Sequence, residues 1–146
     1  RVGDLLVSSI LMKSIKRSNI NNKIFVVCSA ANYDLAKNLS FIDDVFMFKK
    51  GFFNKLRLLI KINLLKIENI LILDGKDRSI LFSMFLFLKK KIYVLDKKKF
   101  SFILNSKKNN LLYDDEVNDT KINIIKKVLG KLSLFFDEKD IDIFEN

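Results

Sequence analysis

The sequence predicts an α/β protein built on a parallel sheet with helices on both of its faces. Short apolar runs rich in Val, Ile and Leu recur along the chain, and longer amphipathic stretches separate them. Such an apolar run is typical of a buried strand, and the stretches between the runs have helical spacing. A strand, a helix and a further strand in succession form a crossover that pairs the two strands in parallel. The alternation therefore predicts one sheet between two layers of helices.

The first half of the chain predicts two helices and two strands. A turn at Gly3 and Asp4 introduces an amphipathic stretch whose basic end, at Lys16 and Arg17, suits a helix C-terminus. The sequence KIFVVC is a continuous β-branched run, which favours a strand covered on both faces. The expected elements are a helix over residues 5–17, a strand over 23–28, a helix over 30–39 and a strand over 45–48.

The second half continues the alternation. Its first stretch, residues 52–66, predicts an amphipathic helix with basic residues facing out. The side chains expected to face the core are Leu56, Leu59, Ile60 and Leu64. The elements expected after it are a strand over residues 69–73, a helix over 79–90, a strand over 91–95, a basic loop over 97–110 and a helix over 117–129 that stops at Gly130.

Composition limits the chemistry that the chain can perform. With 146 residues, 49% hydrophobic and 30% charged, the chain has the size and composition of one globular domain. It has no His, which excludes a Ser-His-Asp triad and a His-based zinc site within the chain. Its single cysteine, Cys28, cannot form an internal disulfide, so we expect a buried structural thiol and a reducing compartment.

The charge and the hydropathy predict a cytoplasmic protein with anionic partners. The net charge of +10 suits phosphorylated sugars, lipid headgroups or nucleic acid, although a Lys-rich and Asn-rich codon bias explains part of it. The start of the chain lacks the pattern of a signal peptide, and the most apolar window, residues 80–88, is too short to span a bilayer.

Ligands of parallel α/β sheets bind at the carboxyl ends of the strands. The segments expected there are residues 29–32, 49–54, 74–79 and 96–100, with the turn at Gly3 and Asp4 joining them if a strand precedes Arg1.

Several segments resemble one enzyme family in the same order. The opening RVGDLLVSS, followed by ILMKSIKR, is similar to the N-terminal motif of ADP-heptose:lipopolysaccharide heptosyltransferases, glycosyltransferase family 9. The segments KIFVVCSAA, IDDV, and ILD followed by Arg78 and Ser79 resemble the family's next three landmarks. The resemblance covers about residues 1–130. Ile10 stands where the family usually has proline.

The resemblance implies a Rossmann-like, three-layer acceptor-binding domain over residues 1–135, the N-terminal half of a GT-B enzyme. It implies that a first strand is missing before Arg1 and that residues 136–146 begin the linker to an absent nucleotide-sugar domain. Enzymes of this family are inverting and metal-independent, and they require no cofactor. The implied reaction transfers heptose or a related sugar from an ADP-sugar donor to a lipopolysaccharide core acceptor.

Asp4 is the residue that the resemblance identifies as the general base. A carboxylate at hydrogen-bond distance can take the proton of the acceptor hydroxyl as that hydroxyl attacks the anomeric carbon. The alternative is that Asp4 only caps the helix. Gly3 is expected to permit a tight turn and close approach of the acceptor. Ser8 and Ser9 are expected either to bind the acceptor or to pack the helix.

Basic residues after the later strands are candidates for binding an anionic acceptor. After the strand over 45–48 these are Lys49, Lys50, Lys55 and Arg57, and a solvated helix face is the alternative. After the strand over 69–73, Arg78 is the best anion contact, and Asp74 either faces the interdomain cleft or caps the helix.

A basic cluster near Phe100, Phe102 and Leu104 predicts peripheral contact with the inner membrane. Its members are Lys89–Lys91, Lys97–Lys99, Lys107 and Lys108. The competing functions are a non-catalytic flavodoxin-like binding module and a basic surface for nucleic acid. The chain has no zinc motif and no aromatic-basic pattern of an RNA-binding sheet, so we expect no nucleic-acid partner.

Overall fold

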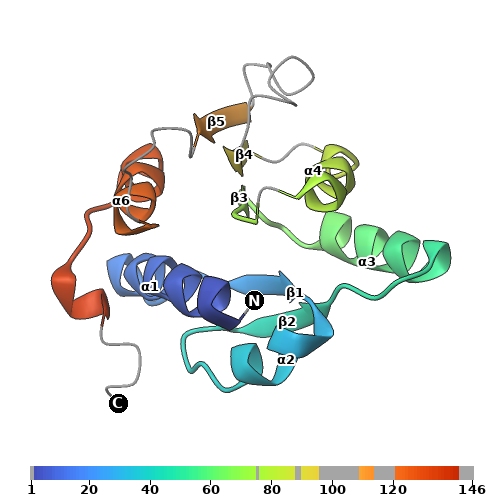
Figure 1. Cartoon of the computed structure of the whole chain (residues 1–146), viewed down its shortest axis with the longest axis horizontal. Helices are drawn as coiled ribbons and strands as arrows, with labels where there is room; N and C mark the ends of the chain where they lie inside the picture. The colour runs from blue at the N-terminus through green and yellow to red at the C-terminus, as the bar shows by residue number, and fades with distance from the viewer. Residues whose placement is uncertain (1, 75, 88–89, 96–108, 114–120, 142–146) are drawn as a thin grey trace. The chain divides into compact units, whose positions relative to one another are not determined.

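The structure is a computed structural model that describes residues 2–74, 76–87, 90–95, 109–113 and 121–141. It is an α/β structure whose strands pair in parallel (Figure 1). The chain divides into two compact units. The first unit comprises Arg1–Lys55 and Leu129–Asn146, and the second comprises Leu56–Val128. Each unit has its own sheet.

The first unit is a parallel strand pair with two helices and a C-terminal turn of 3-10 helix. Its elements are α1 (Val2–Ser18), β1 (Phe25–Cys28), α2 (Ala30–Lys37), β2 (Asp44–Met47) and η2 (Glu138–Ile141). The expected order of helices and strands is confirmed. The boundaries differ from the expected ones by up to three residues. The largest difference is at the start of α1, which includes Gly3 and Asp4 in its first turn, where the sequence predicted a turn before the helix.

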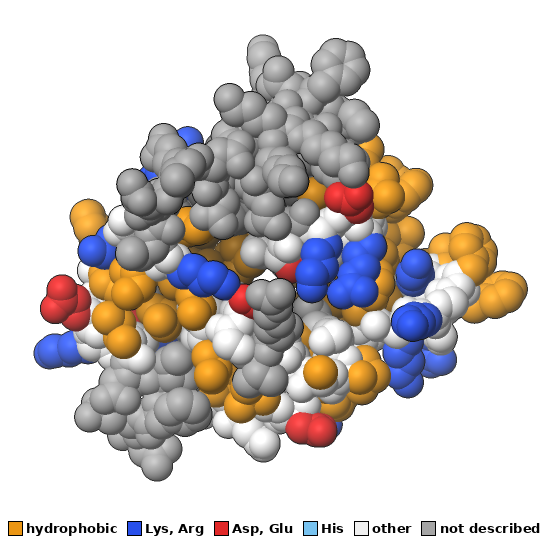
Figure 2. Space-filling model, viewed as in Figure 1, with side chains coloured by type: hydrophobic (Ala, Val, Ile, Leu, Met, Phe, Trp, Pro, Cys, Tyr) orange, Lys and Arg blue, Asp and Glu red, His pale blue; other side chains and the backbone are white. Residues whose placement is uncertain are grey.

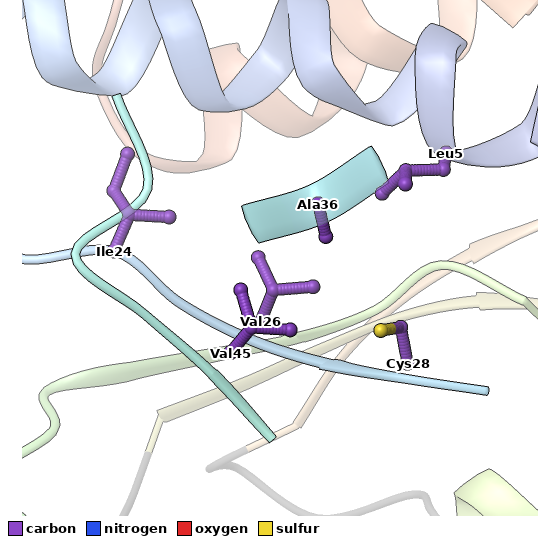
Figure 3. Close-up of a cluster of buried hydrophobic side chains, with 6 residues drawn as sticks. All are labelled: Leu5, Ile24, Val26, Cys28, Ala36 and Val45. Atoms are coloured by element: carbon purple, nitrogen blue, oxygen red, sulfur yellow. The ribbon is translucent and has the colours of Figure 1, made fainter. Parts of the chain in front are cut away.

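Side chains from α1, α2 and both strands form the core of the first unit (Figure 3). The cluster consists of Leu5, Ile24, Val26, Cys28, Ala36 and Val45. Along β1, Val26 and Cys28 point into it while Val27 is exposed. The expectation that this strand is covered on both faces was therefore wrong, because α1 and α2 supply side chains to the same cluster.

The second unit carries a parallel sheet of three strands in the order β3-β4-β5. Its elements follow α3 (Phe52–Leu64), which begins in the first unit, and they are β3 (Asn69–Ile72), α4 (Asp77–Met84), β4 (Lys90–Leu95) and β5 (Asn109–Tyr113). The chain then enters α6 (Lys121–Lys131), which runs through Gly130, the expected stop. None of the helices in the described ranges is both long and apolar enough to cross a bilayer.

The orientation expected for α3 was wrong. Leu58 and Ile62 are its buried residues, whereas Leu56, Ile60 and Leu64 are exposed. Both sets repeat every four residues, so helical spacing alone could not decide which set faces the core.

The strands form two sheets within the described residues, in place of the one continuous sheet that the alternation predicted. The expected strands over residues 69–73 and 91–95 are present as β3 and β4, while β5 was not predicted. Residues 97–108, with Phe100, Phe102, Leu104 and five lysines of the basic cluster, lie outside the described residues, as does Lys89. Lys90 and Lys91 belong to β4.

Residues 138–141, which form η2, are packed on α1. Asp140 is buried, and its carboxylate accepts hydrogen bonds from the Ser14 hydroxyl at 2.6 Å and from Arg17 Nε and Nη2 at 3.0 and 2.9 Å. Burial alone raises the pKa of Asp140, but the hydrogen bonds from Arg17 and Ser14 outweigh it and lower the pKa. A bidentate contact between an arginine and a buried carboxylate is among the stronger polar interactions of a protein.

Replacement of Asp140 by Ala is expected to lower the free energy of unfolding by about 2–3 kcal/mol, because three hydrogen bonds to a charged group are lost. Urea unfolding followed by circular dichroism measures the change. The matched control is Asp137→Ala, which removes a 3.5 Å ion pair to Arg17 and an exposed 3.0 Å hydrogen bond from the Lys139 N–H, and it should cost under about 1 kcal/mol. An equal decrease in the free energy of unfolding for the two variants would show that the buried contacts of Asp140 stabilise the fold no more than the surface contacts of Asp137.

Candidate functional site

The first turn of α1 lies at the carboxyl end of β1. At the other end of the helix, Lys16 Nζ donates a 2.8 Å hydrogen bond to the Asn22 carbonyl, and Asn22 Nδ2 donates one of 3.0 Å to the Ile15 carbonyl. The end of α1 is thus held beside the start of β1, and the helix runs antiparallel to the strand. Figure 3 shows the result, with Leu5 at the Cys28 end of the cluster and Ile24 at the opposite end. Ligands of α/β sheets bind at this carboxyl edge.

Asp4 is exposed in the first turn of α1. A carboxylate here is favoured by the positive end of the helix dipole. The Ser8 hydroxyl donates a 2.7 Å hydrogen bond to the Asp4 backbone carbonyl, which is the i−4 bond of a helical serine. Gly3 is also helical and exposed, and a Cβ added to it would meet nothing within 4 Å. The tight turn expected at Gly3 is therefore absent.

The two serines of α1 differ in accessibility. Ser8 is half-buried, whereas Ser9 is fully buried and its hydroxyl donates a 2.6 Å hydrogen bond to the Leu6 carbonyl. A side chain without exposed surface does not reach a ligand in this conformation. Of the two roles expected for the serines, Ser9 has the packing role.

Two exposed lysines follow β2 at the same edge of the sheet. The Phe48 N–H donates a 2.7 Å hydrogen bond to the Cys28 carbonyl, so the two strands remain paired up to the residue before Lys49. Lys49 and Lys50 come next, and Gly51, with φ of 98°, turns the chain into α3. This left-handed conformation favours glycine. One edge of the first unit therefore brings together the first turn of α1, with Asp4, and the two lysines.

Cys28 lies at this edge but is not a candidate nucleophile. Its thiol is buried, as the sequence predicted, and burial raises its pKa. A protonated, buried thiol is a poor nucleophile.

Of the other basic candidates, Lys55 is exposed on α3 in the first unit, and its Nζ lies 5.9 Å from the centre of the Phe48 ring. The remaining two belong to the second unit. Arg57 is exposed on α3, and Arg78 is exposed in the first turn of α4. Asp74 accepts hydrogen bonds from the Ser79 hydroxyl at 2.7 Å and from the Lys76 N–H at 3.3 Å. These are local contacts of the turn before α4. The N-cap residue of this helix is Lys76 and not Asp74, and it makes no side-chain capping hydrogen bond. No group of three or more Cys, Asp or Glu side chains in the described ranges is arranged to hold a metal ion.

Asp43 has a structural role that the sequence did not predict. Its carboxylate accepts a 2.7 Å hydrogen bond from the Ile24 N–H, and Lys16 Nζ lies 3.0 Å from Oδ2. This contact joins the end of α1 to the start of both strands, and so it helps to fix the direction in which α1 presents Asp4. The sequence signal was present in the IDDV segment, but no spacing rule pairs Lys16 with a residue in that segment.

Comparison of the chain with family models, with curated proteins and with solved structures gives no match.

The contribution of Asp43 to stability is expected to depend on pH. The hydrogen bond from the Ile24 N–H, followed by Lys16, lowers the pKa of Asp43. The contribution is therefore fully present above the unfolded-state value of about 3.9 and is lost as the pH falls through the lower folded-state pKa. Asp43→Asn should lower the free energy of unfolding by about 1 kcal/mol at pH 7. Urea titrations at pH 7, 5 and 3 should show the two proteins converging at the acidic end.

The matched control is Asp44→Asn. The Asp44 carboxylate contacts the N–H of the next residue, Val45, at 2.8 Å. We expect this variant to change stability by less than about 0.5 kcal/mol at each pH. An Asp43→Asn deficit of the same size at pH 3 and pH 7 would contradict the ionic role.

Proposed function

We propose that this chain forms the acceptor-binding half of an inverting, metal-independent glycosyltransferase of the GT-B type. In this proposal the enzyme transfers heptose or a related sugar from an ADP-sugar to an anionic lipopolysaccharide core acceptor, and Asp4 is the general base. The observation that carries the proposal is the location of Asp4, which is exposed in the helix turn at the carboxyl edge of the β1–β2 pair.

This location suits the chemistry of inversion. The acceptor hydroxyl attacks the anomeric carbon from the side opposite the ADP leaving group, so its proton has to leave on the acceptor side. An exposed carboxylate on a rigid helix can accept that proton as the new bond forms. The charge of the helix N-terminus stabilises the carboxylate, and the proton transfer then occurs late in the attack.

The cations near this edge supply the second part of the argument. Lys49 and Lys50 follow β2, on the edge where Asp4 lies, and they can bind the carboxylates or phosphates of a core oligosaccharide. Arg57 and Arg78 are further candidates on the second unit. In enzymes of the family that the chain resembles, a separate C-terminal domain holds the nucleotide sugar. The proposal therefore assigns the donor to a domain outside these 146 residues.

Replacement of Asp4 by Asn tests the base. In a protein that joins this chain to its nucleotide-sugar domain, we expect Asp4→Asn to lower kcat by about 100- to 10,000-fold, because an amide cannot accept the proton. The KM for the acceptor should change little. Release of ADP from the sugar nucleotide, in the presence of the core oligosaccharide, is the measurement.

The control variant is Asp34→Asn, an exposed carboxylate on α2 of the same unit, which should keep full turnover. Equal turnover by Asp4→Asn and the wild type would disprove the base role. Binding of the core oligosaccharide to the 146-residue chain, followed by NMR, separates the alternatives. If the 146-residue chain binds the core oligosaccharide but the joined protein releases no ADP, the result would favour a non-catalytic binding module.

A further inference from the structure

Helix α3 has two apolar faces, and only one of them is covered. Leu58 and Ile62 are buried. Leu56, Ile60 and Leu64 lie on a different face, since each residue advances by about 100° around the helix. Ile60 and Leu64 are 52% and 79% exposed. Their exposure is unexpected, because a second row of aliphatic side chains on a helix is normally covered.

The exposed row begins with two phenylalanines. Phe52 and Phe53 are 73% and 82% exposed, and their rings lie 5.7 Å apart in an edge-to-face arrangement. We call the exposed residues Phe52, Phe53, Leu56, Ile60 and Leu64 the outer face of α3. The face lies on one continuous helix. Figure 2 shows hydrophobic and basic side chains next to each other on the side of the view where Figure 1 places α3.

Within the second unit, further exposed aromatic residues are attached to this helix. Asn63 Oδ1 accepts a 3.0 Å hydrogen bond from the Phe87 N–H, and Asn63 Nδ2 donates one of 3.2 Å to the Phe85 carbonyl. Phe85 and Phe87 are both exposed. The hydrogen bonds of Asn63 thus fix the segment after α4 beside α3.

The segment that carries the outer face has charges of one sign. Residues 49–66 include six basic residues and no acidic residue. The basic residues are Lys49, Lys50, Lys55, Arg57, Lys61 and Lys66. The surface therefore combines exposed aromatic and aliphatic side chains with cations whose long stems can reach past them.

We infer that the outer face of α3 docks on a lipid bilayer that carries anionic headgroups. A helix with Phe and Leu on one side and Lys and Arg beside them is the pattern that lies in the plane of a membrane interface. Each cation near an anionic surface adds to the attraction. Nucleic acid would satisfy the cations but would leave the aliphatic row in water. A second copy would bring two cationic faces together. The inference depends on α3 and not on the proposed glycosyl transfer.

A fluorescence experiment tests the docking directly. The chain has no Trp, so Phe53→Trp introduces a single reporter on the outer face. Phe135, which is 90% exposed, supplies the matched control variant Phe135→Trp. Vesicles of phosphatidylcholine with phosphatidylglycerol should shift the emission of Phe53→Trp to shorter wavelength and leave Phe135→Trp unchanged. Vesicles of phosphatidylcholine alone should give a much weaker response.

Vesicle co-sedimentation measures the charge contribution. Lys61→Gln with Lys66→Gln should weaken binding to anionic vesicles about 25-fold, since each cation contributes about fivefold. Lys37→Gln with Lys139→Gln removes the same net charge from exposed positions elsewhere and should weaken binding less. Phe52→Ser with Phe53→Ser should also reduce binding, and Phe135→Ser should not.

Three results would overturn the inference. One is an emission of Phe53→Trp that does not change with anionic vesicles. Another is a shift that appears with rising protein concentration in the absence of lipid, which would assign the face to a second copy. The third is an equal response to a DNA or RNA oligonucleotide and to anionic vesicles, which would assign it to polyanions in general.

Discussion

The packing of α1 against the β1–β2 pair determines the position of the candidate site. Leu5 near the start of the helix and Val26 and Cys28 on β1 share one hydrophobic cluster with Val45 on β2. Burial of side chains of this size stabilises a fold by roughly 1.5–3 kcal/mol each. Leu5 is next to Asp4 in the chain, so the contact that buries the leucine also directs the aspartate to the edge of the sheet. The polar contacts of Lys16, at the other end of α1, set the direction of the helix.

The two ends of the first unit use charge in different ways. Where α1 ends, Asp43 and Asp140 each contact a basic side chain of that helix, and both carboxylates accept hydrogen bonds. These pairs hold the helix to the strands and to η2. At the carboxyl end of β2, Lys49 and Lys50 are exposed, and they begin the cationic segment that continues along α3. Charges that stabilise the fold are thus separated from charges that are available to a partner.

The sequence predicted the strands of this chain better than the orientation of its helices. The runs at β1, β2, β3 and β4 are apolar and lie between helical stretches, so local pattern was sufficient. For α3 it was insufficient, because two rows of aliphatic residues compete and only tertiary packing buries Leu58 in place of Ile60. The partner of Arg17 could not be predicted, since Asp140 lies 123 residues away. The resemblance to the family's motif identified Asp4 as a candidate, and the structure shows that Asp4 is exposed.

The exposed row on α3 has a physical cost that helps to explain what the surface is for. Leaving Phe52, Phe53 and Leu64 in water forgoes about 25 cal/mol for every square ångström that a contact would bury. A chain that needed α3 only to connect β2 with β3 could carry polar residues at these positions without disturbing Leu58 or Ile62. Cations beside the row would oppose burial against a like-charged surface and favour burial against an anionic one. The combination is therefore better explained by an anionic, partly apolar partner than by the folding of the chain itself.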